Sequence, residues 1–260
     1  MPFPAAWVAY FDPDTYDPVT GTGTLANLLD EKDPKVLQDR EYGFTKRRMV
    51  EIRGGDASFP QTFDAAHLQA IHKYLFQDVY DWAGQWRTVD MAKDVTDFAS
   101  IHGGIDKVVA EVAKHVNGTH WDWLSRRETV EELAGVFALL NHAHPFREGN
   151  GRAGRMFLRD VAAMSHFDLK FGRVGRDLWN QASAFSSPDM GSDRPHPEEL
   201  YPVFGKIVVE KQPAQPNNSI ASTLAAQQIA QPTMQAAASS AQLYRPAPPA
   251  VPVIAPHLTL

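Results

Sequence analysis

A glycine-containing loop between two stretches of helical periodicity is the feature that most constrains the fold. In the first stretch, about residues 127–142, large apolar residues recur at steps of three or four and share one helix face: Val130, Leu133, Phe137 and Leu140. The second stretch, after Gly151, keeps this period with Ala153, Met156, Phe157, Val161 and Met164. The sequence HPFREGNG, residues 144–151, separates them. We therefore predict a helix, a short loop, and a second helix whose first turn adjoins the loop.

The rest of the folded part is also predicted to be mainly helical. A further helix face is formed by Leu68, Ile71, Leu75 and Val79. Another helix is predicted around residues 197–209. The segment WRTVDMAKDVTDFAS, residues 86–100, breaks the helical period, and Val89, Met91 and Val95 predict two short extended pieces around AKD. The pattern indicates an all-α protein with one small β-hairpin.

The composition changes near Lys211. From Gln212 to the end, Arg245 is the only formally charged residue, and eight of the nineteen prolines fall in this part. Such a segment has too few large apolar groups to offset the entropy that ordering would cost. We predict a folded domain over residues 1–211 and a disordered, low-complexity tail over residues 212–260.

The overall composition excludes several classes of function. A formal net charge of −6 argues against a general binder of phosphate backbones, so we predict no direct nucleic acid binding. The absence of cysteine excludes disulfides, thiolate catalysis and cysteine-ligated zinc. No apolar run reaches membrane-spanning length, and the first residues lack a basic leader followed by a long apolar core. We therefore expect a soluble cytoplasmic protein without membrane contact, and these features do not test translocation as a secreted effector.

The loop carries more chemistry than a turn requires. Gly149 and Gly151 let the backbone aim N–H groups at one point, where the start of the second helix adds a partial positive charge. Arg152 and Arg155 are three residues apart and are expected to lean over the same side of the first turn, which suits a di- or triphosphate. Glu148 beside phosphates requires a cation, and Mg²⁺ binds carboxylate and phosphate oxygens together. We therefore predict a site for a magnesium-bound nucleotide.

His144 is the candidate general base, since an imidazole that titrates near neutrality can accept a proton from an attacking hydroxyl. Phe146 is predicted to anchor the loop on the helices. Each of these residue types has an ordinary structural explanation when it occurs alone, and only their combination favours a site. A transition-metal site built from His142, His144 and Glu148 is disfavoured, because the histidines lack the i, i+4 spacing of zinc hydrolases.

These residues complete the Fic motif, HPFx[D/E]GNGRxxR. Its fixed positions are filled by His144, Pro145, Phe146, Glu148, Gly149, Asn150, Gly151, Arg152 and Arg155. Upstream, YDPVTGTGTLANLLDEKDPKVLQDRE resembles the amino-terminal segment of bacterial Fic toxins, and LQAIHKYLFQDVYDWAGQWRTVDMAKDVTDFAS resembles their first long helix and β-hairpin flap. The resemblance covers about residues 16–209. It implies the Fic fold, an all-α helical bundle with a small β-hairpin flap.

The resemblance also implies an activity, the transfer of AMP from ATP to a hydroxyl side chain of a target protein with release of pyrophosphate. It implies that His144 deprotonates the target hydroxyl and that Glu148 holds Mg²⁺. The backbone of Gly149, Asn150 and Gly151, with the Asn150 side chain, would hold the α- and β-phosphates, and Arg152 and Arg155 the outer phosphates. The flap, about residues 86–99, would pair with a strand of the target through Val89, Asp90, Met91, Ala92, Lys93 and Asp94.

Two features refine this expectation. Gly151 stands where the phosphorylating Doc branch has lysine, which favours AMP as the transferred group. The inhibitory string [S/T]xxxE[G/N] is absent, and Thr129 is followed four residues later by Leu133. Either a separate small antitoxin inhibits the enzyme or the enzyme is unrestrained. The arrangement resembles the toxin half of a two-component pair, in which the antitoxin glutamate would pair with Arg155. In the most similar toxins the targets are the ATPase subunits of DNA gyrase and topoisomerase IV. The alternatives are transfer of phosphate, UMP or phosphocholine, and a non-catalytic nucleotide-binding regulator.

Overall fold

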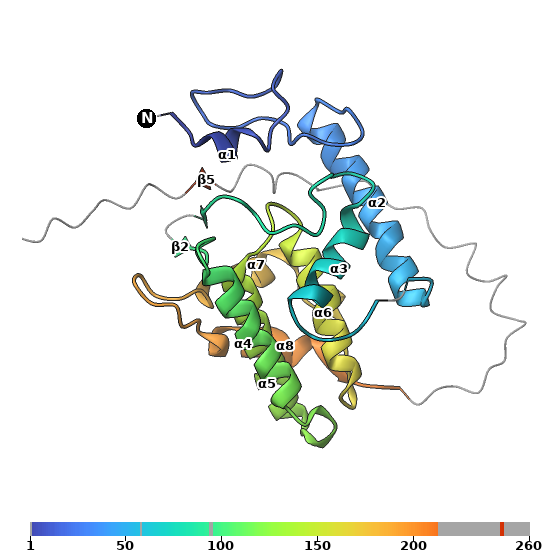
Figure 1. Cartoon of the computed structure of the whole chain (residues 1–260). Helices are drawn as coiled ribbons and strands as arrows, with labels where there is room; N and C mark the ends of the chain where they lie inside the picture. Colours follow the sequence, from blue (N-terminus) through green and yellow to red (C-terminus); the bar gives the residue numbers. More distant parts are fainter. Residues whose placement is uncertain (1, 58, 94–95, 213–244, 247–260) are drawn as a thin grey trace, which may run out of the picture.

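Three helices form the centre of the fold, and α6 packs against the other two (Figure 1). They are α3 (Ala65–Phe76), α5 (Arg126–Ala143) and α6 (Asn150–Ala163). The computed structural model describes residues 2–57, 59–93, 96–212 and 245–246. The motif loop joins α5 to α6, so the two central helices determine where its residues lie.

Shorter or peripheral helices surround this centre. They are α1 (Ala5–Val8), α2 (Pro34–Gly54), α4 (Gly104–Gly118), α7 (Arg176–Phe185) and α8 (Tyr201–Ile207), with 3₁₀ turns at Trp121–Trp123, Phe171–Arg173 and Pro197–Leu200. Helix α2 packs against α3, whereas α4 and α8 pack against α5. Helix α7 contacts α8 and forms one wall of the cavity described below.

Local sequence explains where the principal helices begin and end. Ser125 and Glu128 form a capping box at α5, in which each side chain bonds to the backbone of the other residue. Asp33 accepts bonds from the first N–H groups of α2, and Pro34 occupies the position where no N–H is needed. Helix α2 ends at Gly54 and is capped by Gly55, whose φ of 83° is left-handed. Asp64 caps α3 by accepting from the N–H of His67.

Two small sheets complete the structure. Strands β1 (Met91–Lys93) and β2 (Thr96–Asp97) form the antiparallel flap hairpin, with Ala92 opposite Asp97. The other edge of β1 pairs with β5 (Arg245–Pro246), far along the chain, with Ala92 opposite Arg245. Strands β3 (Phe167–Leu169) and β4 (Val208–Glu210) pair antiparallel and bring residues that follow α6 and α8 together.

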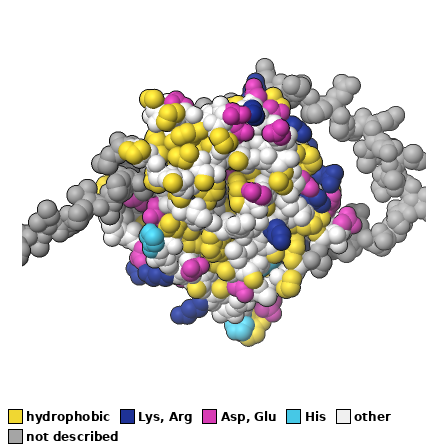
Figure 2. Space-filling model, turned by 45° about the horizontal axis from the view of Figure 1, so that its top comes forward, with side chains coloured by type: hydrophobic (Ala, Val, Ile, Leu, Met, Phe, Trp, Pro, Cys, Tyr) yellow, Lys and Arg dark blue, Asp and Glu magenta, His cyan; other side chains and the backbone are white. Residues whose placement is uncertain are grey.

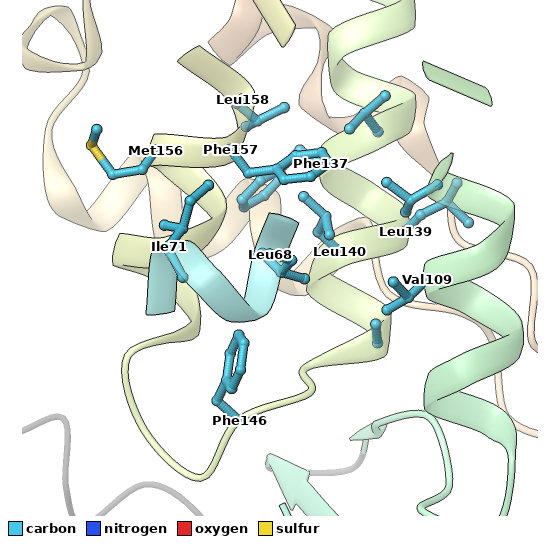
Figure 3. Packing of buried hydrophobic residues seen from close by; sticks show 14 of the residues in the cluster. Leu68, Ile71, Val109, Phe137, Leu139, Leu140, Phe146, Met156, Phe157 and Leu158 are labelled. Carbon is cyan, nitrogen blue, oxygen red and sulfur yellow. The ribbon is translucent and has the colours of Figure 1, made fainter. Parts of the chain in front are cut away.

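The apolar core lies between α3, α5 and α6. Figure 3 shows side chains from the three helices meeting there, among them Leu68 and Ile71 of α3, Phe137 and Leu140 of α5, and Phe157 of α6. All five are almost completely buried. Burial of a large apolar side chain contributes about 1.5–3 kcal/mol, so this cluster supplies much of the energy that fixes the two helices on either side of the motif loop.

The predicted fold class, helical with a small hairpin, is confirmed. The helix predicted over residues 127–142 is found as α5, and the hairpin lies where the extended pieces were expected. Three residues differ from the prediction: Val79 is buried but follows the end of α3, Val89 lies in a bend before β1, and Met164 caps α6 and is 36% exposed. Residues 197–209 form a 3₁₀ turn, α8 and part of β4 rather than one helix. Val95 lies outside the described residues, as does the predicted tail except Gln212 and β5.

Among the described residues, no helix combines the length and apolar character that crossing a membrane would require. On the face drawn in Figure 2, acidic and basic side chains are interspersed with apolar ones.

Candidate active site

The motif loop begins at a strained residue and is closed by an asparagine. His144 follows α5 with a left-handed backbone, φ 38° and ψ 54°, which is uncommon for a residue other than glycine. The Asn150 side chain spans the loop: its Oδ1 accepts from the N–H of Phe146 at 2.9 Å, and its Nδ2 donates to the Phe146 carbonyl at 2.7 Å. The Asn150 amide therefore fixes the shape of the loop. Only one of its N–H hydrogens is left for the phosphate contact that the motif implies.

Gly149 provides the turn into α6. Its φ is +84°, and a Cβ added at this position would lie 2.2 Å from the ζ-carbon of Phe76. Only glycine fits both the backbone and the space. Helix α6 begins immediately afterwards, so the N–H groups of Asn150 and Gly151 have no acceptor within the helix. They lie at the positive end of the helix dipole, which is a site suited to anions.

These N–H groups adjoin a cavity of about 350 Å³. Its walls come from the flap, α5, the start of α6 and α7, and they include Lys93, Phe98, Leu140, Asn141, His144, Asn150, Gly151, Gly154, Trp179, Asn180, Ser183 and Phe185. The volume is in the range of pockets that enclose small molecules. Of the predicted site residues, the cavity brings together His144, Asn150 and Gly151, with Lys93 from the flap.

The His144 imidazole is buried and stacks on Phe98, with ring centroids 3.9 Å apart. Burial lowers its pKa from 6.5 to about 3, and the positive charge of Arg87 acts in the same direction. The ring is therefore neutral at physiological pH, which is the form that can accept a proton, but contrary to expectation it does not titrate near neutrality and is a weaker base than an exposed imidazole.

Arg87 joins the flap to the motif loop, and sequence reasoning missed it. Its Nε donates to the carbonyl of His144 at 2.9 Å, and its Nη1 donates to the carbonyl of Val89 at 2.6 Å. Its Nη2 donates to the carbonyl of Ala99, and its own N–H donates to the carbonyl of Pro145 at 2.8 Å. A buried guanidinium that holds backbone carbonyls of the loop and of both arms of the flap fixes the flap beside the base.

The two motif arginines diverge, contrary to the expectation that both lean over one side of the first turn. The Arg155 guanidinium lies over the ring of Trp179, 4.8 Å from its centroid, on the α7 side of α6. The Arg152 guanidinium lies on the α2 side, with Nη2 2.6 Å from Oε1 of Glu41 and its plane over Phe76. The buried Glu41 carboxylate was not foreseen, and it explains the direction of Arg152, because a buried carboxylate needs a paired cation.

Glu148 has one engaged and one unengaged carboxylate oxygen. Oε1 accepts from the N–H of Gly149 at 3.0 Å and lies 3.3 Å from Nη2 of Arg152. Oε2 is buried without a hydrogen-bond partner among the described residues. An unpaired buried carboxylate oxygen fits a cation ligand. No group of three or more potential metal ligands occurs in the described part of the chain, and Mg²⁺ that arrives with a nucleotide needs only one or two protein carboxylates.

The amino-terminal segment supports the loop through Arg147, the variable position of the motif. Its side chain is 2% exposed, and its guanidinium carbon lies 4.6 Å from the Trp7 ring centroid and within 5.6 Å of the Tyr10 and Phe11 centroids. Such cation–π contacts of a desolvated guanidinium stabilise by about 2 kcal/mol. The spacing of the motif gave no signal for this role, because the partners lie over a hundred residues away.

The predicted flap residues have different environments. Val89, Met91 and Ala92 are buried, and Asp90 Oδ1 accepts from the N–H of Ile101 at 2.8 Å. Lys93 lines the cavity, and Asp94 lies outside the described residues.

Comparison with known proteins shows which family the chain resembles. Residues 62–162 match the Fic/DOC family. VbhT, a protein adenylyltransferase of Bartonella schoenbuchensis, is 37% identical over 172 residues, which are 64% of this chain and 35% of VbhT. The chain thus spans about a third of that relative. The Escherichia coli protein named "probable protein adenylyltransferase Fic" is 30% identical over 198 residues, 73% of this chain and 90% of that protein.

Two solved structures share the fold. The BepC protein of Bartonella tribocorum, with bound AMPPNP, is 27% identical with a TM-score of 0.67, covering 78% of this chain and 97% of that one. The N-terminal Fic domain of a Bep effector from Bartonella quintana, with bound ADP, is 26% identical with a TM-score of 0.67, covering 78% of this chain and 95% of that one. Together, the fold and the motif loop define a Fic domain, and the relatives that share it carry the name protein adenylyltransferase or probable protein adenylyltransferase. The chain belongs to the Fic/DOC family.

Proposed function

We propose that this protein binds ATP in the cavity and transfers AMP to a hydroxyl side chain of a target protein. The observation that carries the proposal is that one cavity joins a neutral, buried imidazole to the N–H groups at the start of α6. The bound ADP and AMPPNP of the two related structures support a nucleotide in this class of domain.

In the proposed reaction His144 accepts the proton of the target hydroxyl, and the hydroxyl oxygen attacks the α-phosphorus of ATP. The bond from the α-phosphorus to the bridging oxygen of the β-phosphate breaks, and pyrophosphate leaves. The N–H groups of Asn150 and Gly151 offset the charge of the phosphates, and Arg155 reaches the outer phosphates. Arg152 is the second arginine proposed for the outer phosphates, and its Nη2 is paired with Glu41 and Glu148.

Glu148 would hold Mg²⁺ through its unengaged oxygen, Oε2. The ion, when bound, would neutralise charge on the phosphates. Everything else in the proposed chemistry is done by groups of this chain, which bind the phosphates, orient the target and accept the proton.

The flap is proposed to orient the target. Lys93 lies at the cavity wall, and a target strand that replaced β5 at the edge of β1 would carry its hydroxyl towards His144. Gly151 supports AMP rather than phosphate as the transferred group, because Doc-type enzymes have lysine at that position.

The biological role proposed is a toxin that acts in the cytoplasm and is inhibited by a small antitoxin. The absence of an [S/T]xxxE[G/N] string supports inhibition by a separate chain, whose glutamate would pair with Arg155. The ATPase subunits of DNA gyrase and topoisomerase IV are the proposed targets, on the resemblance to bacterial Fic toxins.

Labelled ATP tests the proposal directly. The protein is incubated with a bacterial lysate and ATP labelled at either the α- or the γ-phosphate, and modified proteins are identified by mass spectrometry. We expect α-label and an AMP adduct in protein, lost in a His144→Ala variant that still binds nucleotide. Label from the γ-phosphate in protein would show phosphate transfer instead. No adduct of any kind from the wild type would favour a non-catalytic nucleotide-binding regulator.

A further inference from the structure

A second buried histidine touches the motif loop from the opposite side to the cavity. His72, on α3, has no exposed surface. Its imidazole lies between two aromatic rings, stacked on Phe146 with centroids 3.7 Å apart and planes 14° apart, and on Phe76 at 4.6 Å. The ring therefore has one orientation, and neither its spacing in the sequence nor the motif assigns it a role.

The hydrogen bonds of this ring fix its proton. The N–H of Gly84 donates to Nδ1 of His72 at 2.9 Å, and a backbone N–H can only donate. Nδ1 is therefore the unprotonated nitrogen, and the proton of the neutral ring is on Nε2. Nε2 lies 3.0 Å from the carbonyl oxygen of Glu148, so His72 donates this hydrogen bond to the motif loop.

This bond acts on the peptide unit between Glu148 and Gly149. A trans peptide is planar, and its C=O and N–H point in opposite directions. His72 holds the C=O end, and the N–H end donates to Oε1 of the Glu148 side chain at 3.0 Å. Rotation of this peptide would move the carboxylate and change the backbone that leads into α6. The position of Oε2, the oxygen without a partner, thus depends on the plane that His72 holds.

We propose that His72 is a positioning residue that fixes the Glu148–Gly149 peptide and, through it, the Glu148 carboxylate for binding of a magnesium-bound nucleotide. The proposal rests on the proposed function, because it takes Glu148 as the residue that meets the cation.

The chain offers a matched control on the same helix. His67 of α3 is also buried, its Nε2 lies 3.1 Å from Oδ2 of Asp160, and its ring contacts Phe63 and Phe157. None of these partners belongs to the motif loop. Replacement of His67 therefore disturbs α3 and the core as replacement of His72 does, without releasing the Glu148 peptide.

The test is calorimetric binding of a non-hydrolysable ATP analogue, with Mg²⁺ or with EDTA, to the wild type and to His72→Phe, His72→Gln and His67→Phe. Phenylalanine keeps the stacking and removes both hydrogen bonds, whereas glutamine can still donate to the Glu148 carbonyl. Partners that orient a metal ligand typically account for about 10–100-fold in metal affinity. We expect Mg²⁺ to increase the affinity of His72→Phe for the analogue by a factor about 10–100 times smaller than in the wild type. His72→Gln should recover most of it, and His67→Phe should retain it.

Three results would overturn the inference. They are an unchanged Mg²⁺-dependent gain in His72→Phe, an equal loss in His67→Phe, and a His72→Gln variant as weak as His72→Phe. If His72→Phe does not fold, nuclear magnetic resonance of the wild-type imidazole still decides. The proton must be on Nε2 of His72, and a proton on Nδ1 contradicts the assignment. Failure of the wild type itself to bind the analogue would instead reject the proposed function.

Discussion

Replacement of Gly149 by alanine tests whether the entry to α6 is as constrained as the structure indicates. The φ of +84° is left-handed, and the new methyl group would lie 2.2 Å from the ζ-carbon and 2.4 Å from the ε2-carbon of Phe76. Phe76 cannot move aside freely, because it is completely buried and stacks on His72. The substitution therefore combines backbone strain with overpacking.

The two effects give the magnitude. A left-handed backbone costs an alanine about 1–2 kcal/mol, and overpacking of a filled site costs about 1–3 kcal/mol. Alanine also restricts the unfolded chain, which offsets about 0.4–1 kcal/mol of this. We expect Gly149→Ala to lower the free energy of unfolding by about 1–4.6 kcal/mol. For a domain of this size that corresponds to a fall in Tm of roughly 2–18 °C.

Urea and thermal unfolding measure the change, and Gly151→Ala is the matched control. A Cβ on Gly151 would meet nothing within 4 Å, and this residue lies in the first turn of α6. Because alanine favours helix over glycine by about 1 kcal/mol, we expect Gly151→Ala to leave Tm unchanged or raise it. The reasoning is refuted if Gly149→Ala unfolds within about 0.5 kcal/mol of the wild type, or if both variants lose equal stability.

Three further outcomes are expected. Glu41→Ala removes the 2.6 Å partner of the half-buried Arg152 guanidinium, which keeps Glu148 at 3.3 Å, so urea unfolding should show a loss of about 1.5–3 kcal/mol, and a loss under about 0.5 kcal/mol contradicts the pairing. The pKa of His144 lies below its ordinary 6.5, so magnetic resonance titration should find the ring neutral at pH 5. Because the unfolded chain takes up this proton at a higher pH than the folded protein, the free energy of unfolding should fall as the pH drops below 6.5. The proposed target strand and β5 compete for the same edge of β1. Ending the chain after residue 240 removes β5, so modification of target protein should be faster, and an unchanged rate contradicts this competition.

The sequence predicts the elements whose signals are local. The helical periods on both sides of the motif identify α5 and α6, because the buried face of each repeats within the helix itself. The break in that period identifies the flap hairpin. Gly149 is recognised as a turn residue for the same reason, since its conformation depends on its own backbone.

Pairings between distant segments could not be predicted in this way. The spacing of Arg152 and Arg155 places both near the first turn of α6, but Glu41 of α2 draws Arg152 to one side, while Arg155 lies over Trp179 of α7. Nothing near either arginine in the sequence encodes these partners. The same holds for Arg147, whose aromatic partners belong to the amino-terminal segment.

These distant pairings explain how the site is held before a nucleotide binds. Arg87 holds the carbonyl at the start of the loop, and His72 holds the carbonyl of Glu148 near its end. Between them, the Asn150 amide closes the turn on Phe146. The backbone N–H groups at the start of α6 and the imidazole of His144 therefore keep their relative positions without help from the ligand. Because dipoles that are already oriented need no reorganisation as charge develops, the proposed transfer would require little rearrangement of these N–H groups. Substitution of His72, which contacts the loop from the side opposite the cavity, should therefore impair nucleotide binding although it changes no residue that lines the cavity.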